Sequence, residues 1–506
     1  MHPRSSQSQS SLLQRVAGFV FSRRGARAGL HVVIIAALLG GFAAFASVRL
    51  PHNANDHDAI HYLCMAHNLV HHGTISTQRT LTPKPWLSAW RSPGYPALLA
   101  AGVVLVPDLY DITLPTFLRA ELLPLKKWQI GWLLLVAAVA GVFAWRLTGS
   151  PWPGYIAGAA VAYSPALILF LNRFYSEFGA MVVLFFFSLT FYWCLRRPRW
   201  WVFLLAGLLL GGGALTRAVL MYYWPLAALL IIAAAWRGAL TWRRATAGLL
   251  LFTLAFALPV GIWLARNHHY FGRWILTFRG GHVLDIRANH AAMTPKEHLA
   301  ALVYYTPWAY INPLVRESPA PGDFYHPPGY EKFLGLDLYA LTLGRVLTLE
   351  DFNRLRVQNR GDTFEMEGQY NWSRHTKWLG HYTVGDLHSQ KRAVKKILAR
   401  PGGHLLACLP LAWRGLFCDT WWIALPGFAA LFFLAGSSLR RRDWPLLAFL
   451  LPSLYVYVFH SLITVNAHRF NSPLMPVLAV CLAICLHRIW RHCARKRAAK
   501  SEAPHA

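Results

Sequence analysis

The chain has 506 residues, of which 55% are hydrophobic and only 14% are charged, and it contains 22 tryptophans. This is too much apolar surface for one water-soluble core, so the composition excludes an ordinary soluble domain and predicts a membrane protein with several spans. The formal net charge of +29 does not indicate nucleic-acid binding, because the basic residues stand in short clusters between apolar runs, where such clusters set membrane orientation.

The first long apolar segment runs from Leu30 to Val48 without a charged residue. At 1.5 Å per residue its length nearly matches a hydrocarbon core of about 30 Å, and we expect an uncleaved membrane-spanning helix. A cleaved signal peptide is the competing interpretation. It is weaker because residues 1–29 precede the run and no small-residue cleavage pattern clearly follows it.

Residues 56–96 follow directly and carry Asp56, Asp58, several histidines and the string Arg91-Ser92-Pro93-Gly94-Tyr95-Pro96. The two aspartates have a structural interpretation, because acids at the start of a helix accept hydrogen bonds from its free amides. Capping and catalysis are compatible. Asp58 heads the more helix-like pattern, so we expect it to be the more rigidly held.

The histidines of this region come in pairs four residues apart, His57 with His61 and His67 with His71. Such spacing puts two imidazoles on one helix face, as in some metal sites. We assign no metal ligand here, because the sequence supplies no third one and half-polar rings suit a loop near lipid headgroups. A divalent metal is left open as a cofactor.

The stretch from Pro93 to Val106 is short for a span, is broken by prolines and suits an interfacial or re-entrant helix. If it does not cross, four later basic clusters fall on the side of the basic N-terminus, as the positive-inside rule requires. If it crosses, the two middle clusters move outside together. We adopt the non-crossing arrangement. The four clusters are Arg196/Arg197/Arg199, Arg237/Arg243/Arg244, Arg440/Arg441/Arg442 and Arg491 to Lys500.

The predicted fold is an all-α polytopic membrane protein with about ten transmembrane helices. Five parts follow: a cytoplasmic tail (1–29), a seven-span core (30–266) that includes an outer loop (49–127), an extracytoplasmic loop domain (267–419), three C-terminal spans (420–488) and a basic cytoplasmic tail (489–506). Within the loop domain Thr348 to Arg360 and Ser389 to Leu398 are expected to be helical. The spans after the first are expected near 128–147, 154–171, 178–195, 200–215, 218–235, 246–265, 420–438, 444–463 and 473–487.

Glu177 is the only acidic residue between Glu121 and Asp285, and it stands where one span ends and the next begins. A carboxylate there is costly unless it is used or paired, and a local pair with Arg173 is the structural alternative. In the chosen topology Glu177 shares the outer face with Asp58, which suits acid/base chemistry.

Four arginines, Arg91, Arg217, Arg266 and Arg469, fall at outer ends of predicted spans, against the usual orientation bias. Together they would suit a phosphate or pyrophosphate at the membrane surface, since guanidinium groups bind phosphate oxygens bidentately. Individually, each can instead be an anchor that reaches toward the headgroups.

These residues resemble the polyprenyl-phosphate-sugar-dependent GT-C glycosyltransferases, in particular the protein O-mannosyltransferases and lipid A aminoarabinose transferases. The resemblance spans most of the membrane part. It departs from the family where His57 separates Asp56 from Asp58 and where Arg-Phe replaces the commoner Arg-Tyr. The matching stretches are Asp58-Ala59 with Tyr62, Ala66, Asn68-Leu69 and Gly73, then Arg91 to Pro96, Ser176-Glu177, Gly207 to Arg217, Arg266-Asn267 with Phe271-Gly272, and Arg469-Phe470 with Pro473 and Pro476.

The resemblance implies a GT-C fold with membrane-parallel helices in the first outer loop. It also implies that Asp58 is the first-loop carboxylate, either general base or acceptor-orienting group, and that Glu177 is the second-loop acid. Which of Asp56 and Asp58 is the base stays open. The arginines would face the donor phosphate, and the candidate substrate-binding residues are Tyr62, Tyr95 and His468.

The expected function is sugar transfer from a polyprenyl-phosphate donor to a glycan, lipid or protein acceptor at the extracytoplasmic face, with inversion if displacement is a single step. A transporter or flippase of lipid-linked sugars is the alternative, although paired half-repeats and broken midplane helices are not evident. A noncatalytic receptor is a third. The basic C-terminus suits a bacterial inner membrane, while an endoplasmic reticulum location would obey the same topology.

Overall fold

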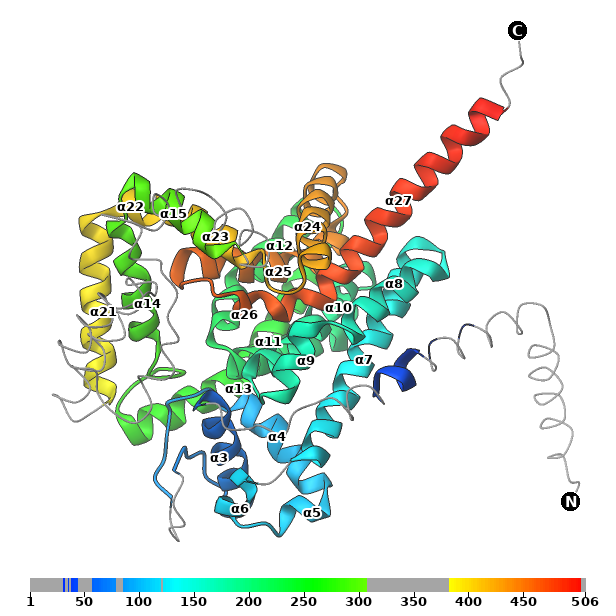
Figure 1. Ribbon diagram of the computed structural model, residues 1–506. Helices are drawn as coiled ribbons and strands as arrows, with labels where there is room; N and C mark the ends of the chain where they lie inside the picture. The colour runs from blue at the N-terminus through cyan, green and yellow to red at the C-terminus, as the bar shows by residue number, and fades with distance from the viewer. Residues whose placement is uncertain are drawn as a thin grey trace, which may run out of the picture.

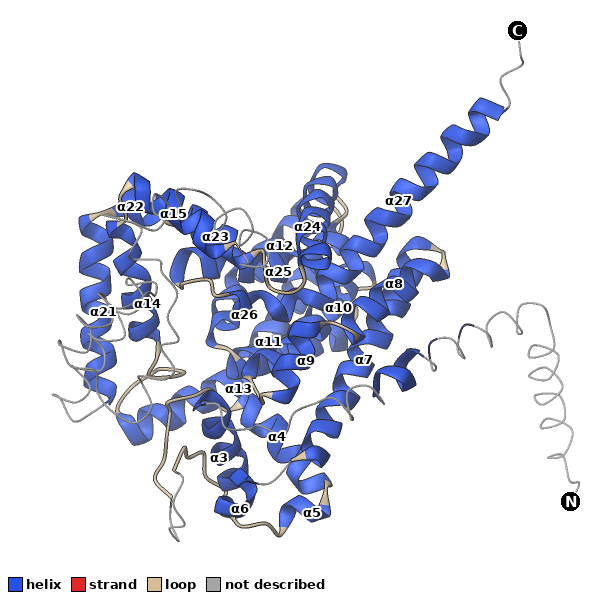
Figure 2. Cartoon of the chain, in the orientation of Figure 1, coloured by secondary structure: helices blue, strands red, loops and turns tan. Residues whose placement is uncertain are grey.

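The computed structural model describes residues 31, 35, 38–43, 57–78, 85–119, 122–306 and 382–501. Within these ranges the chain is built of helices, without a strand (Figures 1 and 2). The α-helices are α3 (His57–His72), α4 (Gly94–Leu105), α5 (Pro107–Tyr110), α6 (Leu114–Arg119), α7 (Leu123–Thr148), α8 (Pro151–Ala162), α9 (Pro165–Asn172), α10 (Ser176–Arg196), α11 (Trp200–Thr216), α12 (Trp224–Trp236), α13 (Trp242–Phe271), α14 (Gly280–Asn289), α15 (Pro295–Tyr305), α21 (Tyr382–Ala399), α22 (Pro401–Leu406), α23 (Cys408–Gly415), α24 (Trp421–Arg441), α25 (Trp444–Ile463), α26 (His468–Asn471) and α27 (Met475–Ser501). Short 3₁₀ turns are η1 (Ala218–Tyr223), η2 (His290–Ala292) and η4 (Ser472–Leu474).

Eight helical segments of the described chain are long and apolar enough to cross a membrane, which confirms the all-α polytopic class. Two further apolar helices, Gly94–Leu105 and Trp200–Thr216, are shorter. Every predicted span after the first coincides with one of these helices. The first, Leu30 to Val48, lies mostly outside the described residues, as does the helix expected from Thr348 to Arg360.

Proline and glycine mark several helix ends. Pro151 and Pro165 open α8 and α9, where the fixed φ of proline suits the first turn and no amide partner is lost. Gly149 ends α7 and Gly272 ends α13, both in the left-handed conformation that a side chain disfavours. These signals divide the apolar sequence into separate antiparallel helices.

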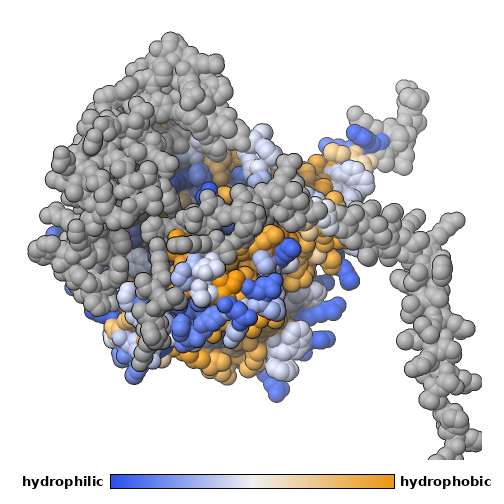
Figure 3. Space-filling view, turned by 60° about the horizontal axis from the view of Figure 1, so that its bottom comes forward, coloured by the Kyte–Doolittle hydropathy of each residue, from blue (hydrophilic) through white to orange (hydrophobic). Residues whose placement is uncertain are grey.

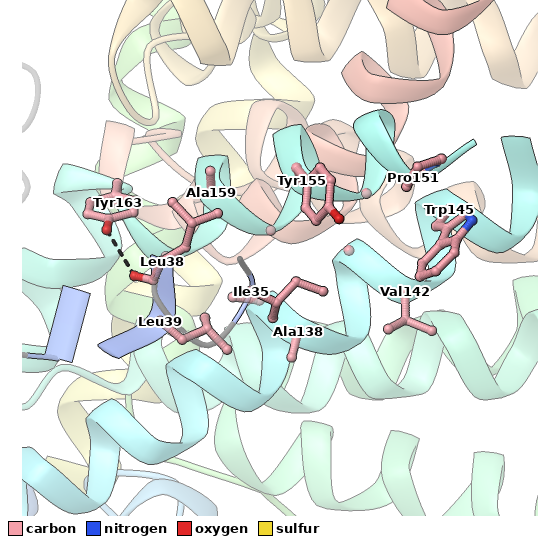
Figure 4. A pocket seen from close by; sticks show the side chains of 15 residues that line it. Ile35, Leu38, Leu39, Ala138, Val142, Trp145, Pro151, Tyr155, Ala159 and Tyr163 are labelled. Carbon is pink, nitrogen blue, oxygen red and sulfur yellow. Dashed lines mark hydrogen bonds between the residues drawn. The ribbon is translucent and has the colours of Figure 1, made fainter. Parts of the chain in front are cut away.

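Helices α7 and α8 pack closely because both carry glycine at the contact. A Cβ added to Gly141 would lie 2.8 Å from the carbonyl oxygen of Gly154, so neither position has space for a side chain. The described residues of the first predicted span lie against the same pair, where the Tyr163 hydroxyl donates to the Leu38 carbonyl at 2.9 Å (Figure 4). The N-terminal segment therefore contacts the core at α7 and α8.

Helix α10 is the most deeply enclosed of the eight candidate spans, with 78% of its apolar window buried. It contacts α4, α11 and α25, which lie far apart in the sequence. Its neighbour α11 returns in the opposite direction, so the start of α10 and the end of α11 meet at one end of the bundle. Arg196, the last residue of α10, and Arg197 and Arg199 of the linker are at the other end.

The second predicted outer segment contributes α14, α15 and α21 to α23. Helix α14 packs on α21, and the buried Asp285 of α14 pairs with Arg392 and with Lys396 (3.3 Å) of α21. Helix α21 confirms the helix predicted from Ser389 to Leu398 and extends it in both directions. Residues 307–381 lie outside the description, so the division of the chain into five parts stays a prediction.

The surface separates into polar and apolar regions. Seen from the end of the molecule where α3 and α5 lie, hydrophilic side chains gather beside a broad apolar surface (Figure 3). Large apolar side chains of α13 are exposed: Leu250 by 60%, Leu258 by 61% and Ile262 by 65%. Exposed apolar surface along long helices is typical of contact with lipid.

Candidate active site

Five charged side chains from distant parts of the sequence meet at one end of the helices. Asp58 lies in the first turn of α3 and Glu177 in the first turn of α10. Arg91 precedes α4, Arg217 directly follows α11 and Arg469 lies in α26. Each stands where a helix begins or ends, so antiparallel packing alone brings them to a common face.

Asp58 forms ion pairs with two arginines. Its Oδ1 accepts a hydrogen bond from Arg91 Nη2, and its Oδ2 lies 3.3 Å from Arg469 Nη1. Burial alone would raise the pKa of the Asp58 carboxyl, but the charges of Arg91 and Arg469 outweigh it and lower that pKa from 3.8 to about 2. The Asp58 carboxylate is therefore ionised at physiological pH.

Glu177 is paired in the same way at the start of α10. Its Oε1 lies 3.0 Å from Arg217 Nη1 and 3.6 Å from Arg469 Nε, and only 6% of its side chain is exposed. Both partners are far from it in sequence, so its role is not limited to a local pair with Arg173. Arg469 contacts both carboxylates and so joins Asp58 to Glu177.

Aromatic rings hold the guanidinium groups in place. Arg217 lies 5.1 Å from the ring centre of Phe470, and Arg469 lies 5.3 Å from that of Tyr175. Arg91 lies 5.4 Å from the ring of Tyr62. Phenylalanine at position 470, one of the two departures from the family pattern, thus serves as a stacking surface for arginine.

The cluster carries a net positive charge. Three guanidinium groups face two carboxylates, which leaves one positive charge in excess. Arg469 is the most exposed of the three, with 35% of its side chain accessible against 16% for Arg217 and 9% for Arg91. The arrangement can therefore bind an anion at Arg469 without losing the contacts that position the two acids.

Arg266, the fourth rim arginine, lies outside this ion-pair cluster. Its Nη1 donates to the carbonyl of Ser88 at 3.0 Å and to Asn267 Oδ1 at 2.7 Å, and its guanidinium stacks 4.6 Å from the ring of Trp263. Ser88 precedes Arg91 by three residues, so Arg266 holds the segment that carries Arg91. Its Nη2 is buried and finds no hydrogen-bond partner among the residues that the structure describes.

The two candidate tyrosines, Tyr62 and Tyr95, connect the helices next to the ion pairs. The Tyr62 hydroxyl donates to Ser176 Oγ at 2.9 Å, which ties α3 to the start of α10. Tyr95 is fully buried, its ring lies 5.2 Å from that of Tyr62, and its hydroxyl donates to Gln129 at 2.7 Å. Both tyrosines thus connect the helices that carry the charged residues, and Tyr95 has no surface open to a ligand.

Of the other predicted site residues, His468 lines a cavity beside the cluster rather than joining it. Asp56 is outside the described residues, so its role stays a prediction. The histidines His67 and His71, to which no ligand role was assigned, have ring centres 4.2 Å apart and tilted planes. Among the described residues, no three histidine, cysteine or acidic side chains are placed to hold a metal ion.

Sequence reasoning missed the residues that build the support behind the charges. Gln129 links Tyr95 to the carbonyl of Leu171 at 2.9 Å, and Asp419 binds the Ser164 hydroxyl. The signal for Asp419 was its position directly before an apolar run, which predicts a helix cap. None was available for Gln129, because a single amide within an apolar helix does not identify its partner.

Comparison with known proteins gives only distant similarity. No family model and no curated protein matches the chain. Among solved structures it is similar to the oligosaccharyltransferase AglB of Archaeoglobus fulgidus in complex with an inhibitory peptide and a dolichol-phosphate (13% identity, TM-score 0.46, 93% of this chain and 52% of that one). It is also similar to the apo form of the A. fulgidus oligosaccharyltransferase (15% identity, TM-score 0.47, 92% and 52%). The chain thus spans about half the length of these proteins, and similarity at this level does not establish a family.

Proposed function

We propose that this protein is a membrane glycosyltransferase of the GT-C type that transfers a sugar from a polyprenyl-phosphate donor to an acceptor. The observation that carries the proposal is the sharing of Arg469 between Asp58 and Glu177 at the ends of apolar helices. A lipid-linked donor presents a phosphate beside a sugar at the membrane surface. The arginines of this cluster can bind the phosphate, and its carboxylates can act at the sugar.

In the proposed reaction an acceptor hydroxyl attacks the anomeric carbon of the donor sugar. A bond forms between the acceptor oxygen and that carbon, and the bond from the carbon to the phosphate oxygen breaks. The lipid phosphate leaves with the electron pair, and the hydroxyl proton passes to a carboxylate, which we assign to Asp58. Arg469 and Arg217 would stabilise the growing charge on the phosphate.

The low pKa of Asp58 fits this role only when substrate is bound. In the free site, Arg91 and Arg469 make its carboxylate a weak base. A phosphate bound to Arg469 would offset part of that positive charge, and the proton affinity of Asp58 would then rise. Substrate binding would thus prepare the base for proton transfer.

A transporter or flippase is supported less well by the position of the charges. Transport sites of this kind lie near the bilayer midplane, at broken helices. Here Asp58, Glu177 and their arginine partners stand at helix ends, on the side opposite Arg196 to Arg199. By the positive-inside rule that face would be extracytoplasmic, and a multi-pass protein of a bacterial inner membrane is the location we propose.

The test is sugar transfer by membranes that contain Asp58→Asn or Glu177→Gln protein, with a radiolabelled polyprenyl-phosphate sugar as donor. We expect each variant to lose activity by about a hundredfold or more, because each loses a carboxylate of the reacting centre. Asp443→Asn is the matched control, since Asp443 caps α25 by accepting from the Leu446 amide at 3.2 Å. Near-normal transfer by a well-folded Asp58→Asn protein would remove Asp58 from the mechanism.

A further inference from the structure

A cavity lies beside the ion-pair cluster and plays no part in the chemistry described above. Its volume is about 380 Å³, within the range of roughly 300–1,000 Å³ typical of small-molecule sites. It is formed between α9, the linker from α23 to α24, and the start of α26. The lining residues are Pro165, Ala166, Leu169, Phe417, Cys418, Asp419, Thr420 and His468.

Asp419 places a carboxylate in the wall of this cavity. It accepts a hydrogen bond from the Ser164 hydroxyl and another from the Thr420 amide at 2.6 Å. The Ala166 amide is a further donor to it. These donors are neutral, and within the described residues no cation lies within ion-pair distance of Asp419. Its charge is thus not neutralised by a cation, whereas Asp58 and Glu177 are paired with arginines.

Asp419 stands at a helix boundary, as Asp58 and Glu177 do. It precedes α24 by two residues, and its partner Ser164 is the N-cap of α9. A carboxylate where two apolar helices begin is costly unless it is used or paired.

The cavity has an exposed apolar rim and a polar neighbour. Pro165 and Leu169 of α9 are exposed, Leu169 by 41%. His468, in the wall, is followed in the chain by Arg469, which contacts both Asp58 and Glu177. A ligand in the cavity is therefore held next to α26, the helix that carries Arg469.

The chemistry of the walls selects the kind of ligand. A phosphate would be repelled by the Asp419 carboxylate, so the donor phosphate does not belong here. Ionised carboxylates accept hydrogen bonds only, and hydroxyl groups are the donors that a sugar supplies. The opposite wall, of proline, alanine and leucine, suits an alkyl chain or the apolar face of a sugar ring.

We propose that this cavity binds the sugar headgroup of a membrane-anchored acceptor, with Asp419 as the residue that orients its hydroxyl groups. The proposal rests on the glycosyltransferase function above and extends it. It specifies the acceptor as a hydroxyl-bearing glycolipid that approaches from within the outer leaflet. Asp419 is a positioning residue in this scheme, and Asp58 remains the base.

The experiment is photolabelling of the full-length protein in nanodiscs with dodecyl glucoside that carries a diazirine next to the sugar. Mass spectrometry should locate saturable labelling on peptides that contain residues 165–169 and 417–420. Unlabelled dodecyl glucoside should compete, and dodecanol should not. Asp419→Asn should lower the labelling about tenfold, the loss expected for one charge-assisted hydrogen bond.

Two variants serve as controls for folding and for the site. Asp443→Asn removes a comparable capping carboxylate at the opposite ends of the helices and should label normally. Ala166→Trp fills the cavity without touching the carboxylate and should also abolish labelling. Unchanged labelling of Asp419→Asn, equal competition by dodecanol, or displacement of the probe by sugar-free undecaprenyl phosphate would each overturn the proposal.

The readout does not depend on catalysis, so the two proposals can fail separately. Asp58→Asn protein should label like the wild type although its sugar transfer is lower by about a hundredfold or more. The wild-type protein could bind the probe in a way that depends on Asp419 and yet transfer no sugar from any polyprenyl-phosphate donor. That pair of results would remove the proposed function and leave a sugar-binding cavity. Normal transfer together with sugar-independent labelling would remove only the cavity assignment.

Discussion

Arg469 is the residue on which the site depends, because within the described part of the chain it alone forms ion pairs with both carboxylates. Its two contacts differ in geometry: Nη1 faces Asp58 at 3.3 Å and Nε faces Glu177 at 3.6 Å. Lysine has a single point charge and no fork, so it cannot reproduce both contacts at once. The identity of the side chain therefore matters here, and not only its charge.

We expect Arg469→Gln and Glu177→Gln each to lower kcat/KM by about 10²–10³, as for the loss of one preorganised charge-stabilising group. Because the two residues contact each other, the double variant should lose much less than the product of the single losses. Transfer assays on the four proteins of this cycle measure the coupling. Losses that multiply would show that Arg469 and Glu177 act independently.

The pKa of Asp58 leads to a prediction of pH dependence. The pKa of Asp58 is about 2 in the folded protein, below the ordinary value of 3.8. The ion pairs of Asp58 therefore stabilise the fold fully above pH 3.8, and this stabilisation is lost as the pH falls toward 2. At the ordinary pH of assay the carboxylate is ionised. We therefore expect no acid limb from Asp58 in kcat/KM above about pH 4.

Arg91→Gln removes the largest charge effect that lowers this pKa. The pKa of Asp58 should then rise, and an acid limb should appear at higher pH in a profile of kcat/KM from pH 4 to pH 8. Arg244→Gln, at the opposite ends of the helices, is the control and should leave the profile unchanged. An acid limb at the same pH in the wild type and in Arg91→Gln would contradict the assignment.

Among the elements, α4 decides whether the acids can meet. It has 12 residues and is thus about 18 Å long, well short of a hydrocarbon core of about 30 Å. Its first residue, Gly94, packs directly on the end of α11. A Cβ there would lie 2.6 Å from Thr216 Oγ1 and 2.7 Å from the Thr216 nitrogen.

Gly94→Ala should therefore separate α4 from α11 and shift Arg91 relative to Arg217. We expect a loss of about 1–3 kcal/mol in stability, seen as a lower Tm, together with reduced transfer. Gly212→Ala, one turn earlier in α11, is the control because nothing lies within 4 Å of its added Cβ. It should be neutral or slightly stabilising, and a Gly94→Ala protein with unchanged Tm and activity would refute this contact.

For the whole molecule, the arrangement of charge along the helices predicts its orientation. The ion-pair cluster and the arginine clusters stand at opposite helix ends, and basic clusters normally stay on the cytoplasmic side. Among the seven cysteines only Cys493, near the end of α27, is exposed. A single introduced cysteine can therefore be labelled with little labelling of the native cysteines, and its labelling reports the topology.

In intact cells, a membrane-impermeant maleimide should label Trp86→Cys, which replaces a side chain that is 65% exposed near Arg91. Arg244→Cys should be labelled only after permeabilisation. Both are made in a Cys493→Ser background. The wild-type protein, which keeps Cys493, serves as a separate cytoplasmic reference. Labelling of Arg244→Cys in intact cells would place the arginine clusters outside and reverse the predicted topology.

The sequence by itself determined the helices and the end of the molecule at which chemistry is expected. Apolar runs of sufficient length form helices in lipid because every backbone amide must be satisfied internally. Glu177 was recognisable because an acid between two spans is costly. The helix α21 was foreseen as well, although the division into domains is still a prediction.

Only the tertiary structure decided which charges meet. Arg469 and Asp58 are separated by 411 positions, and nothing in either neighbourhood names the other. Four rim arginines look alike in the sequence, yet three join the carboxylates and Arg266 instead holds the Ser88 carbonyl. Asp419 likewise gained its cavity only because α9, the linker before α24 and His468 come together in the fold. The physical reason is that local sequence fixes hydrogen bonds within a helix, whereas ion-pair partners depend on which helix ends pack together.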